Sequence, residues 1–167
     1  MGPLIEEKQL SFSNFAFVML AILPDGTSAI GYRQGSLFLW SIDTGEIDHV
    51  LINNLDRSPT ARFSRDGTRV IASLFDSGFI LHSRVWSTQT GRQVATIDEY
   101  GVPALSPDST QAMINNLLWD VETGEQVSGF KRDYTQEHAE FSADGRYILT
   151  LNRDGKVKVW LNPIQKN

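Results

Sequence analysis

The 167-residue sequence predicts an all-β fold made of four repeated units, and three observations carry that prediction. Turn signals with aspartate begin at positions 25, 66, 108 and 144, and tryptophans stand at positions 40, 86, 119 and 160. Short apolar runs alternate with turn residues between these markers, which is typical of antiparallel strands joined by hairpins. A unit of about forty residues with four strands predicts the four-stranded antiparallel blades of a β-propeller or a partial propeller.

The last unit shows this layout most clearly, in the sequence FSADGRYILTLNRDGKVKVW at residues 141–160. Its Ser-Ala-Asp-Gly turn is followed by an apolar run, and a second turn then leads to alternating valines and lysines that end at Trp160. Three earlier segments repeat the layout, the third in shortened form, and there a Thr-Gly turn and a further strand follow the tryptophan. The blades are therefore expected at residues 14–55, 56–100, 101–133 and 134–167.

The predicted sheets explain why the units should stack. Each sheet is apolar on both faces, so one blade cannot bury both faces alone, whereas neighbouring blades stacked around an axis bury one another. The tryptophan ends the third strand of each unit, where a large ring fills the wider outer part of the space between blades. We therefore expect the four tryptophans to be mostly buried: Trp40, Trp86, Trp119 and Trp160.

The most apolar stretch lies near the N-terminus, where residues 15–24 read FAFVMLAILP. A secretory signal would need a basic segment before this run, and here Glu6 and Glu7 precede it with only Lys8 opposing them. The run is also about half as long as a helix that spans a bilayer, and it ends in a Pro-Asp-Gly turn signal. We interpret it as a fully buried strand rather than a signal peptide or a membrane anchor.

Composition and charge narrow the functional classes. Hydrophobic residues make up 41% and charged residues 21% of the chain, as in an ordinary globular protein. The net charge is −5 and the 15 Lys and Arg residues are scattered, which disfavours binding to a nucleic-acid backbone. The chain has no cysteine, which excludes disulfides and thiolate metal sites and is compatible with the cytoplasm, where we expect the protein.

Motifs that carry catalysis or cofactor binding are not found in the sequence. It has no glycine-rich phosphate loop, no His-x-x-x-His pair and no Gly-x-Ser-x-Gly elbow. The three histidines are isolated, and we interpret them as structural or surface residues. The turn aspartates are too far apart to gather the about six to eight oxygens that calcium needs, so we interpret them as turn formers. We predict no catalytic residue, no metal site and no cofactor.

The phrases PDG…LFLWSIDTG, FSRDG…RVWSTQTG, LSPDS…LLWDVETG and FSADG…VKVW cover about residues 14–160 and resemble the WD-repeat family of β-propellers. The resemblance implies a noncatalytic scaffold that binds proteins, on a ring that has seven blades in this family. The Gly-His dipeptide that precedes the first strand in the family is absent from every unit, and only Asp76 and Asp154 lie near the family's turn aspartate. A related quinoprotein-like propeller is the alternative.

The fourth unit lacks its outer strand, because only residues 161–167 follow Trp160 and Pro163 interrupts them. Residues 4–12, LIEEKQLSF, form an additional predicted strand. Propellers similar to this one close with an N-terminal strand that completes the last blade, so segment 1–13 is expected to take that role within one chain or across two. Four blades with the curvature of seven would leave a bare apolar face at each end. We therefore expect self-association, as a homodimer, or docking onto other blades, rather than a closed four-bladed ring or an open arc.

Function is expected on the loops, and the resemblance places them on one rim, at the turns between second and third strands and at the connections between blades. Aromatic and arginine residues are the usual anchors of interfaces. The candidate binding residues on this rim are Arg33, Arg57, Phe75, Tyr100, Tyr134 and Arg153. The expected partner is a protein, and neither nucleic acid nor a membrane. Two alternatives stay open: a fragment of a larger propeller that assembles with other blades as the sensor domain of a multidomain protein, and an enzyme or cofactor-binding quinoprotein-like propeller that works at the central channel.

Overall fold

The computed structural model describes residues 18–75, 78 and 81–164 of the chain. These residues form fifteen strands in four antiparallel sheets, and they contain no helix that is long and apolar enough to cross a membrane. In every sheet, strands that follow one another in the chain are paired, as in a meander. The all-β fold class predicted from the sequence is confirmed, and so is its pattern of repeated antiparallel blades.

We number the sheets as blades in chain order. The first blade consists of β1 (Val18–Ile22), β2 (Ser28–Arg33), β3 (Ser36–Ser41) and β4 (Ile47–Ile52). The second blade consists of β5 (Thr60–Phe63), β6 (Arg69–Phe75), β7 (Leu81–Ser87) and β8 (Gln93–Ile97). The third blade consists of β9 (Ala104–Leu105), β10 (Gln111–Ile114), β11 (Leu117–Asp120) and β12 (Gln126–Gly129). The fourth blade has three described strands, β13 (Gln136–Phe141), β14 (Tyr147–Asn152) and β15 (Val157–Leu161).

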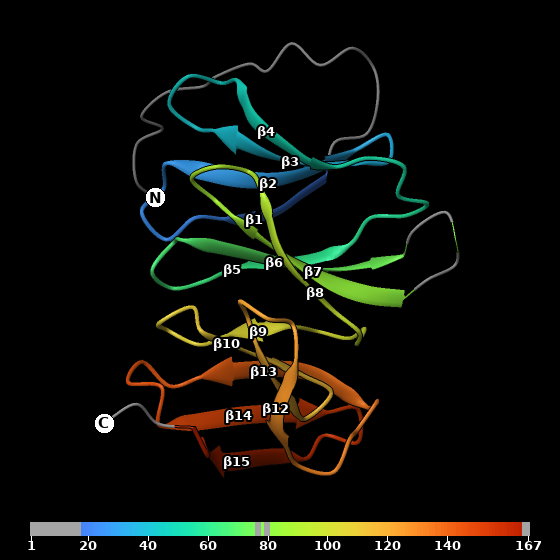
Figure 1. The fold of residues 1–167 in the computed structure, drawn as a ribbon, viewed down its shortest axis with the longest axis vertical. Coiled ribbons are helices and arrows are strands. Elements are labelled where there is room, and N and C mark those ends of the chain that lie inside the picture. The colour runs from blue at the N-terminus through green and yellow to red at the C-terminus, as the bar shows by residue number, and fades with distance from the viewer. Residues whose placement is uncertain (1–17, 76–77, 79–80, 165–167) are drawn as a thin grey trace.

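The blades are stacked along the long axis of the molecule in the order of the chain (Figure 1). The first strands of successive blades lie beside one another, β1 next to β5, β5 next to β9 and β9 next to β13. The first and fourth blades lie at opposite ends of the long axis (Figure 1). The described sheets therefore form an open stack with two end faces.

Tight turns with a left-handed backbone set the ends of the strands. Glycine follows the turn aspartate in three units, with φ between 71° and 77°. In the third unit Ser109 stands at this position with φ of 60°, a conformation that glycine adopts without a steric cost. The turn between β10 and β11 consists of Asn115 and Asn116, both with positive φ, as a type I′ hairpin requires. Because strands alternate in direction, the aspartate turns lie on one rim of the stack and the asparagine turn lies on the other.

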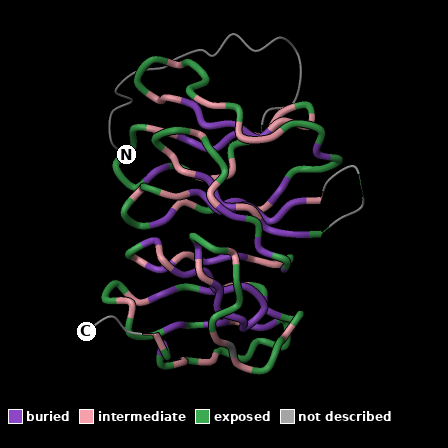
Figure 2. The backbone as a smooth tube through the Cα atoms, viewed as in Figure 1, coloured by how far each residue is buried: buried purple, intermediate pink, exposed green. Residues whose placement is uncertain are grey.

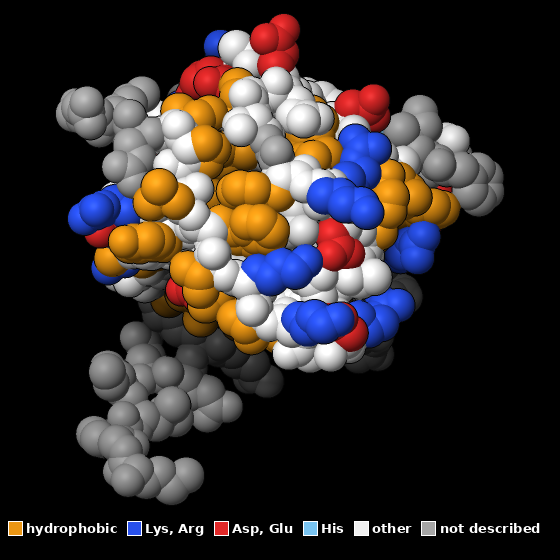
Figure 3. Space-filling view, turned by 90° about the horizontal axis from the view of Figure 1, so that it is seen from below, with side chains coloured by type: hydrophobic (Ala, Val, Ile, Leu, Met, Phe, Trp, Pro, Cys, Tyr) orange, Lys and Arg blue, Asp and Glu red, His pale blue; other side chains and the backbone are white. Residues whose placement is uncertain are grey.

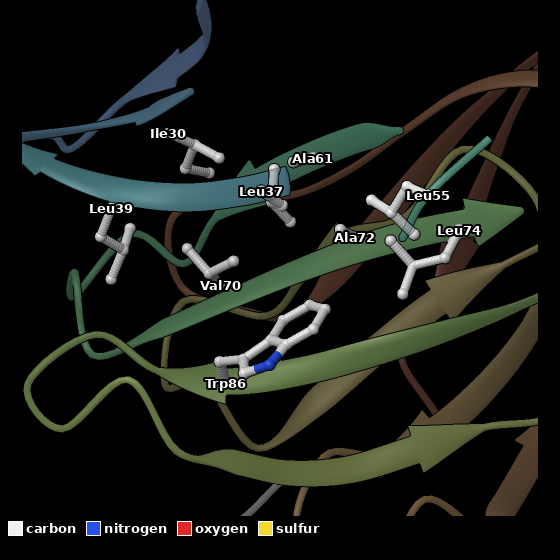
Figure 4. Close-up of a cluster of buried hydrophobic side chains, with 9 residues drawn as sticks. All are labelled: Ile30, Leu37, Leu39, Leu55, Ala61, Val70, Ala72, Leu74 and Trp86. Atoms are coloured by element: carbon white, nitrogen blue, oxygen red, sulfur yellow. The ribbon is translucent and has the colours of Figure 1, made fainter. Parts of the chain in front are cut away.

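Three clusters of buried apolar side chains lie between neighbouring blades. The backbone of the buried residues runs through the interior of the stack (Figure 2). Between the first and second blades, Trp86 shares a cluster with Ile30 and Leu39 (Figure 4). Trp119 belongs to the cluster between the second and third blades, and Trp160 packs against the cluster between the third and fourth. Each junction thus removes apolar surface of two blades from water, which is the main stabilising term.

The prediction that the tryptophans are buried is confirmed for three of them. Trp40, Trp86 and Trp119 are buried, whereas Trp160 is only partly buried. Trp160 stacks on Phe130 with ring centroids 4.0 Å apart, and its Nε1 donates a hydrogen bond to Thr150 Oγ1 at 3.0 Å. In the other blades a fourth strand pairs beside the strand that carries the tryptophan, and the described fourth sheet has no such strand.

The prediction of a fully buried strand at residues 15–24 is wrong for the part that the structure describes. On β1, the side chains of Val18, Met19 and Ile22 are 40–54% exposed. β1 is the edge strand of the first blade, so no further strand of its sheet pairs beyond it, and Ile22 lines an open groove. Residues 15–17 and the predicted strand within segment 1–13 lie outside the described residues.

Candidate interaction surfaces

A buried acidic residue organises the rim that carries the Asn115–Asn116 turn. Glu99, in the connection between the second and third blades, is only 6% exposed. Its carboxylate accepts a hydrogen bond from Asn115 Nδ2 at 2.7 Å and pairs with the guanidinium of Arg132 at 2.9 Å. A buried carboxylate is stable only when it is paired and hydrogen-bonded. Glu99 therefore ties together two blade connections and the turn between them.

Further hydrogen bonds fix the backbone around this pair. Asn115 Nδ2 also donates to the carbonyl of Tyr100 at 2.8 Å. The backbone N–H of Asn116 donates to Gln136 Oε1 at 2.9 Å, and Gln136 Nε2 donates to the carbonyl of Val102 at 3.0 Å. These bonds link the third blade to the start of the fourth. The loops of this rim are thus held in one arrangement, which is the condition for a preorganised binding surface.

Two exposed tyrosines lie close in the chain to the Glu99–Arg132 pair, Tyr100 directly after Glu99 and Tyr134 two residues after Arg132. Tyr134 is 70% exposed and Tyr100 is also exposed. Arg132 Nη1 donates to the hydroxyl of Tyr134 at 3.1 Å, and the guanidinium lies 5.7 Å from the centre of the Tyr134 ring. We call Glu99, Tyr100, Asn115, Arg132 and Tyr134 the rim cluster. It presents two aromatic rings and one arginine to solvent on a buried anionic anchor.

Asp133 holds the edge of the fourth blade next to the rim cluster. Its carboxylate accepts the hydroxyl of Thr135 at 2.6 Å, the backbone N–H of Thr135 at 3.0 Å and the amide of Asn152. Lys158 Nζ lies 3.5 Å from the same carboxylate. The hydrogen bonds from Thr135, followed by those of Asn152 and the charge of Lys158, lower the pKa of Asp133 to about 2. The carboxylate is therefore ionised at neutral pH and joins β14 and β15 to the connection that precedes them.

The other predicted rim residues lie outside the rim cluster. Arg153 is exposed on the turn after β14, where its side chain pairs with Glu137 at 3.2 Å. Arg57 stacks over the ring of Phe75 at 3.9 Å, and this pair joins the connection before the second blade to the end of β6. Arg33 ends β2 in the first blade. The structure thus brings two of the six candidates, Tyr100 and Tyr134, into one cluster.

Sequence reasoning missed the residues that hold the tyrosines in place. In the sequence Arg132 is one of the scattered basic residues, and nothing distinguishes Glu99 or Asn115 from other loop residues. Asn115–Asn116 carried a usable signal, because two consecutive asparagines favour a type I′ turn. The pairing of Glu99 with Arg132 carried no such signal, because it depends on how two blade connections lie in space.

The opposite rim is formed by the aspartate turns. Their carboxylates accept hydrogen bonds mainly from residues of the same turn. Asp25 Oδ1 accepts the backbone N–H of Thr27 at 2.9 Å and its hydroxyl at 2.8 Å, and these bonds lower the pKa of Asp25. Asp66 also accepts a hydrogen bond from the hydroxyl of Ser109 in the next blade. The aspartates therefore close turns locally, and Asp66 connects two neighbouring turns.

A groove of about 520 Å³ runs along the concave side, where the first strands of all four blades meet. Ile22, Phe63 and Phe141 contribute apolar lining from three of these strands. Its polar lining includes Arg62 and a His138–Glu140 pair with 3.6 Å between nitrogen and oxygen. Within the described ranges, no group of three or more metal-binding side chains is found. The groove is thus mainly an apolar surface with a few exposed charges.

The stacked sheets and their rims define a set of propeller-type blades, and comparisons with known proteins show which proteins the chain is similar to. No protein-family model matches the chain. Over 134 residues the chain is 27% identical to Lethal(2) giant larvae protein homolog 1 of Mus musculus, covering 77% of this chain and 12% of that protein. Over 172 residues it is 26% identical to Autophagy-related protein 16 of Arabidopsis thaliana, covering 95% of this chain and 32% of that protein.

A third relative carries the repeat in its name. The chain is 23% identical over 154 residues to NACHT domain- and WD repeat-containing protein 1 of Mus musculus, covering 82% of this chain and 10% of that protein. The chain spans about a third or less of the length of these relatives. Similarity to these proteins and the repeated four-stranded sheets make the chain a distant homologue of WD-repeat proteins. The family resemblance expected from the sequence is confirmed.

Proposed function

We propose that the chain is a noncatalytic WD-repeat module that binds a protein partner through the rim cluster. One observation carries the proposal: Arg132, which pairs with the buried carboxylate of Glu99, donates to the hydroxyl of the exposed Tyr134, and the exposed Tyr100 follows Glu99 in its connection. Tyrosine, tryptophan and arginine dominate the binding energy of protein interfaces. The hydroxyl of Tyr134 is already bonded to Arg132, and a side chain that is held in place loses less conformational freedom on binding, which favours affinity.

The rim cluster suits this role better than the concave groove suits catalysis. An active site needs several polar groups that converge on one point in a shielded pocket. The groove offers the His138–Glu140 pair, and both of these side chains are largely exposed, at 45% and 74%. Binding of a protein segment requires no such convergence. The groove is therefore a weaker basis for an enzymatic function than the rim is for a binding function.

The test uses the intact protein as bait on an extract of its source cells, with captured proteins identified by mass spectrometry. The variant Tyr100→Ala/Tyr134→Ala should capture its main partner at least about tenfold less well, because truncated interface anchors cost about 2 kcal/mol or more. Its free energy of unfolding should change by less than about 1 kcal/mol, because both rings are exposed.

A matched control removes exposed apolar surface elsewhere. Val127, on β12 of the third blade, is 45% exposed and belongs to neither the rim cluster nor the groove. Val127→Ala should capture the partner as well as the unchanged chain does. Full capture by the double tyrosine variant would exclude the rim cluster as the interface.

A further inference from the structure

Each blade carries one cross-strand pair that identifies the face turned toward the next blade. The pair joins the residue just before the tryptophan of the third strand to its partner on the second strand. In the first three blades these pairs are 0–2% exposed, because they pack into the junction with the following blade. The equivalent pairs are Ile30–Leu39, Ile71–Val85, Met113–Leu118 and Leu149–Val159.

The fourth pair is open to solvent. Leu149 is 38% exposed and Val159 is 67% exposed. The cross-strand pair Tyr147–Leu161 flanks it on one side, with both side chains exposed, and Leu151–Val157 flanks it on the other. We call these six residues the end face. Seen from below, hydrophobic side chains gather on this end of the molecule (Figure 3).

The alternation along the two strands shows that the end face is not a solvated surface. On β14 the residues between the exposed ones, Ile148 and Thr150, are fully buried against the third blade. On β15 the charged Lys158 is turned to that inner side, where it lies near Asp133 and the ring of Trp160, while its valine neighbours are exposed. A sheet face in contact with water would carry its polar residues outward. Here the outward positions of β14 and β15 are apolar, and the outward polar residues of this sheet, His138 and Glu140, lie beside them on β13.

The end face also has the exposed apolar side chains and the polar border of a protein interface. Five of its side chains are each 38–67% exposed and lie on one sheet face. Contiguous exposed apolar patches with a polar rim mark interaction sites in soluble proteins. Charged residues border the end face, among them Arg146 and Glu140. An apolar centre with a polar border is the usual anatomy of a protein interface.

The first blade limits what a second copy of the chain can offer to this face. In a propeller, the face that receives the end face would be the one that carries the tryptophan, here Ala29, Phe38 and Trp40. These three side chains are at most 8% exposed and already belong to a buried cluster. Head-to-tail stacking of copies therefore has no open acceptor face. The open apolar face that a second copy presents is therefore the end face of that copy.

We propose that two copies of the chain associate through their end faces about a twofold axis. Twofold dimers are the commonest oligomers, and their interface is formed by the same patch on both subunits. Two apolar sheet faces would pack face to face at about 10 Å, as sheets do in β-sandwiches. The Leu149–Val159 pair lies at the centre of the end face and so lies near the axis. This interface does not involve the rim cluster. Dimerisation through the end face and partner binding through the rim cluster are therefore tested independently.

The test is the molar mass in solution, measured by sedimentation equilibrium over a wide range of protein concentration. The unchanged protein should reach twice the chain mass of 18.7 kDa. Val159→Lys should weaken dimerisation at least about 100-fold, because it buries an unpaired charge in an apolar interface. Val127→Lys introduces the same charge at an exposed valine on β12 and should leave the dimer unchanged.

Two further variants keep the test decisive if lysine disturbs the fold. Val159→Thr preserves the β-branched shape and should weaken the dimer about tenfold through its hydroxyl alone. Val159→Cys introduces a single thiol into a chain without cysteine, and oxidation should link two copies, whereas Val127→Cys should stay unlinked. A protein that remains at 18.7 kDa at every concentration would overturn the proposal and leave the end face to a blade of another chain. A dimer unaffected by changes at Val159 would overturn it as well.

Discussion

The first and fourth blades form the two ends of one stack, and their outer faces differ in exposure. On the first blade, Phe38 and Trp40 belong to a buried cluster and are at most 8% exposed. On the fourth blade, the end face leaves Leu149 and Val159 open to solvent. Both faces are apolar and both arise from the same repeated strand pattern. The pattern therefore decides that a face is apolar, and its neighbour decides whether it is buried.

The three interior junctions show what the end face lacks. In each junction one blade contributes a cross-strand apolar pair, and the next blade contributes its tryptophan. The second and third blades thus each supply half of two interfaces, and contacts between neighbours carry the stability of repeat proteins. The fourth blade has the exposed cross-strand pair Leu149–Val159, and no following blade is described that could pack against it. We expect it to be less stable than the inner blades in the monomer and to gain stability when the end face is covered.

The largest expected losses of stability at the two ends come from their tryptophans. Trp40→Ala should lower the free energy of unfolding by about 3–5 kcal/mol, since it empties a buried site. Trp160→Ala should cost roughly 1–3 kcal/mol, because the ring is partly exposed and loses mainly its stacking on Phe130. Denaturant unfolding of both variants at low protein concentration measures the two costs. Equal losses would show that the two ends are equally well packed.

A second prediction compares the residues that precede these tryptophans. Leu39→Ala should cost about 2–5 kcal/mol, because Leu39 is buried in the junction with the second blade. Val159→Ala should cost less than about 1 kcal/mol in the monomer, since its side chain is already in water. The measurement is denaturant unfolding at protein concentrations too low for the proposed dimer to form. A cost for Val159→Ala as large as that for Leu39→Ala would mean that the end face is covered within one chain.

Sequence reasoning predicted the blades because every blade obeys local rules. Apolar alternation, aspartate turns and the tryptophan near the end of each third strand are features of the local sequence, and they predict the strands and their order. It failed for residues 15–24, because the exposure of β1 depends on whether a sheet lies across the axis. An apolar run is equally compatible with a covered and an uncovered position. Only the arrangement of blades in space separates the two.

The candidate site was predictable in part, for the same reason. Tyr100 and Tyr134 were found because aromatic residues in blade connections are candidates by type and position. The Glu99–Arg132 pair that anchors them was not, because its members come from two separate connections and meet only when the third blade is in place. Four other candidates occupy the same kind of turn or connection but lie outside the rim cluster: Arg33, Arg57, Phe75 and Arg153. Their part in binding remains a prediction.

The smallest expected difference between the two ends is a pH effect. Asp25 in the first blade and Asp133 beside the fourth both have a lowered pKa, and that of Asp133 falls from 3.8 to about 2 through its bonds with Thr135 and Asn152. A carboxyl with a lowered pKa in the folded state stabilises the fold above about pH 4, and this contribution is lost as the pH falls through 2. The unfolding temperature should therefore fall between pH 4 and pH 2.

Asp133→Asn should flatten this pH dependence of the unfolding temperature. Thr135→Val keeps the carboxylate but removes the strongest donor, so it should flatten the dependence partly. An unchanged slope in both variants would show that Asp133 does not hold the fourth blade in place.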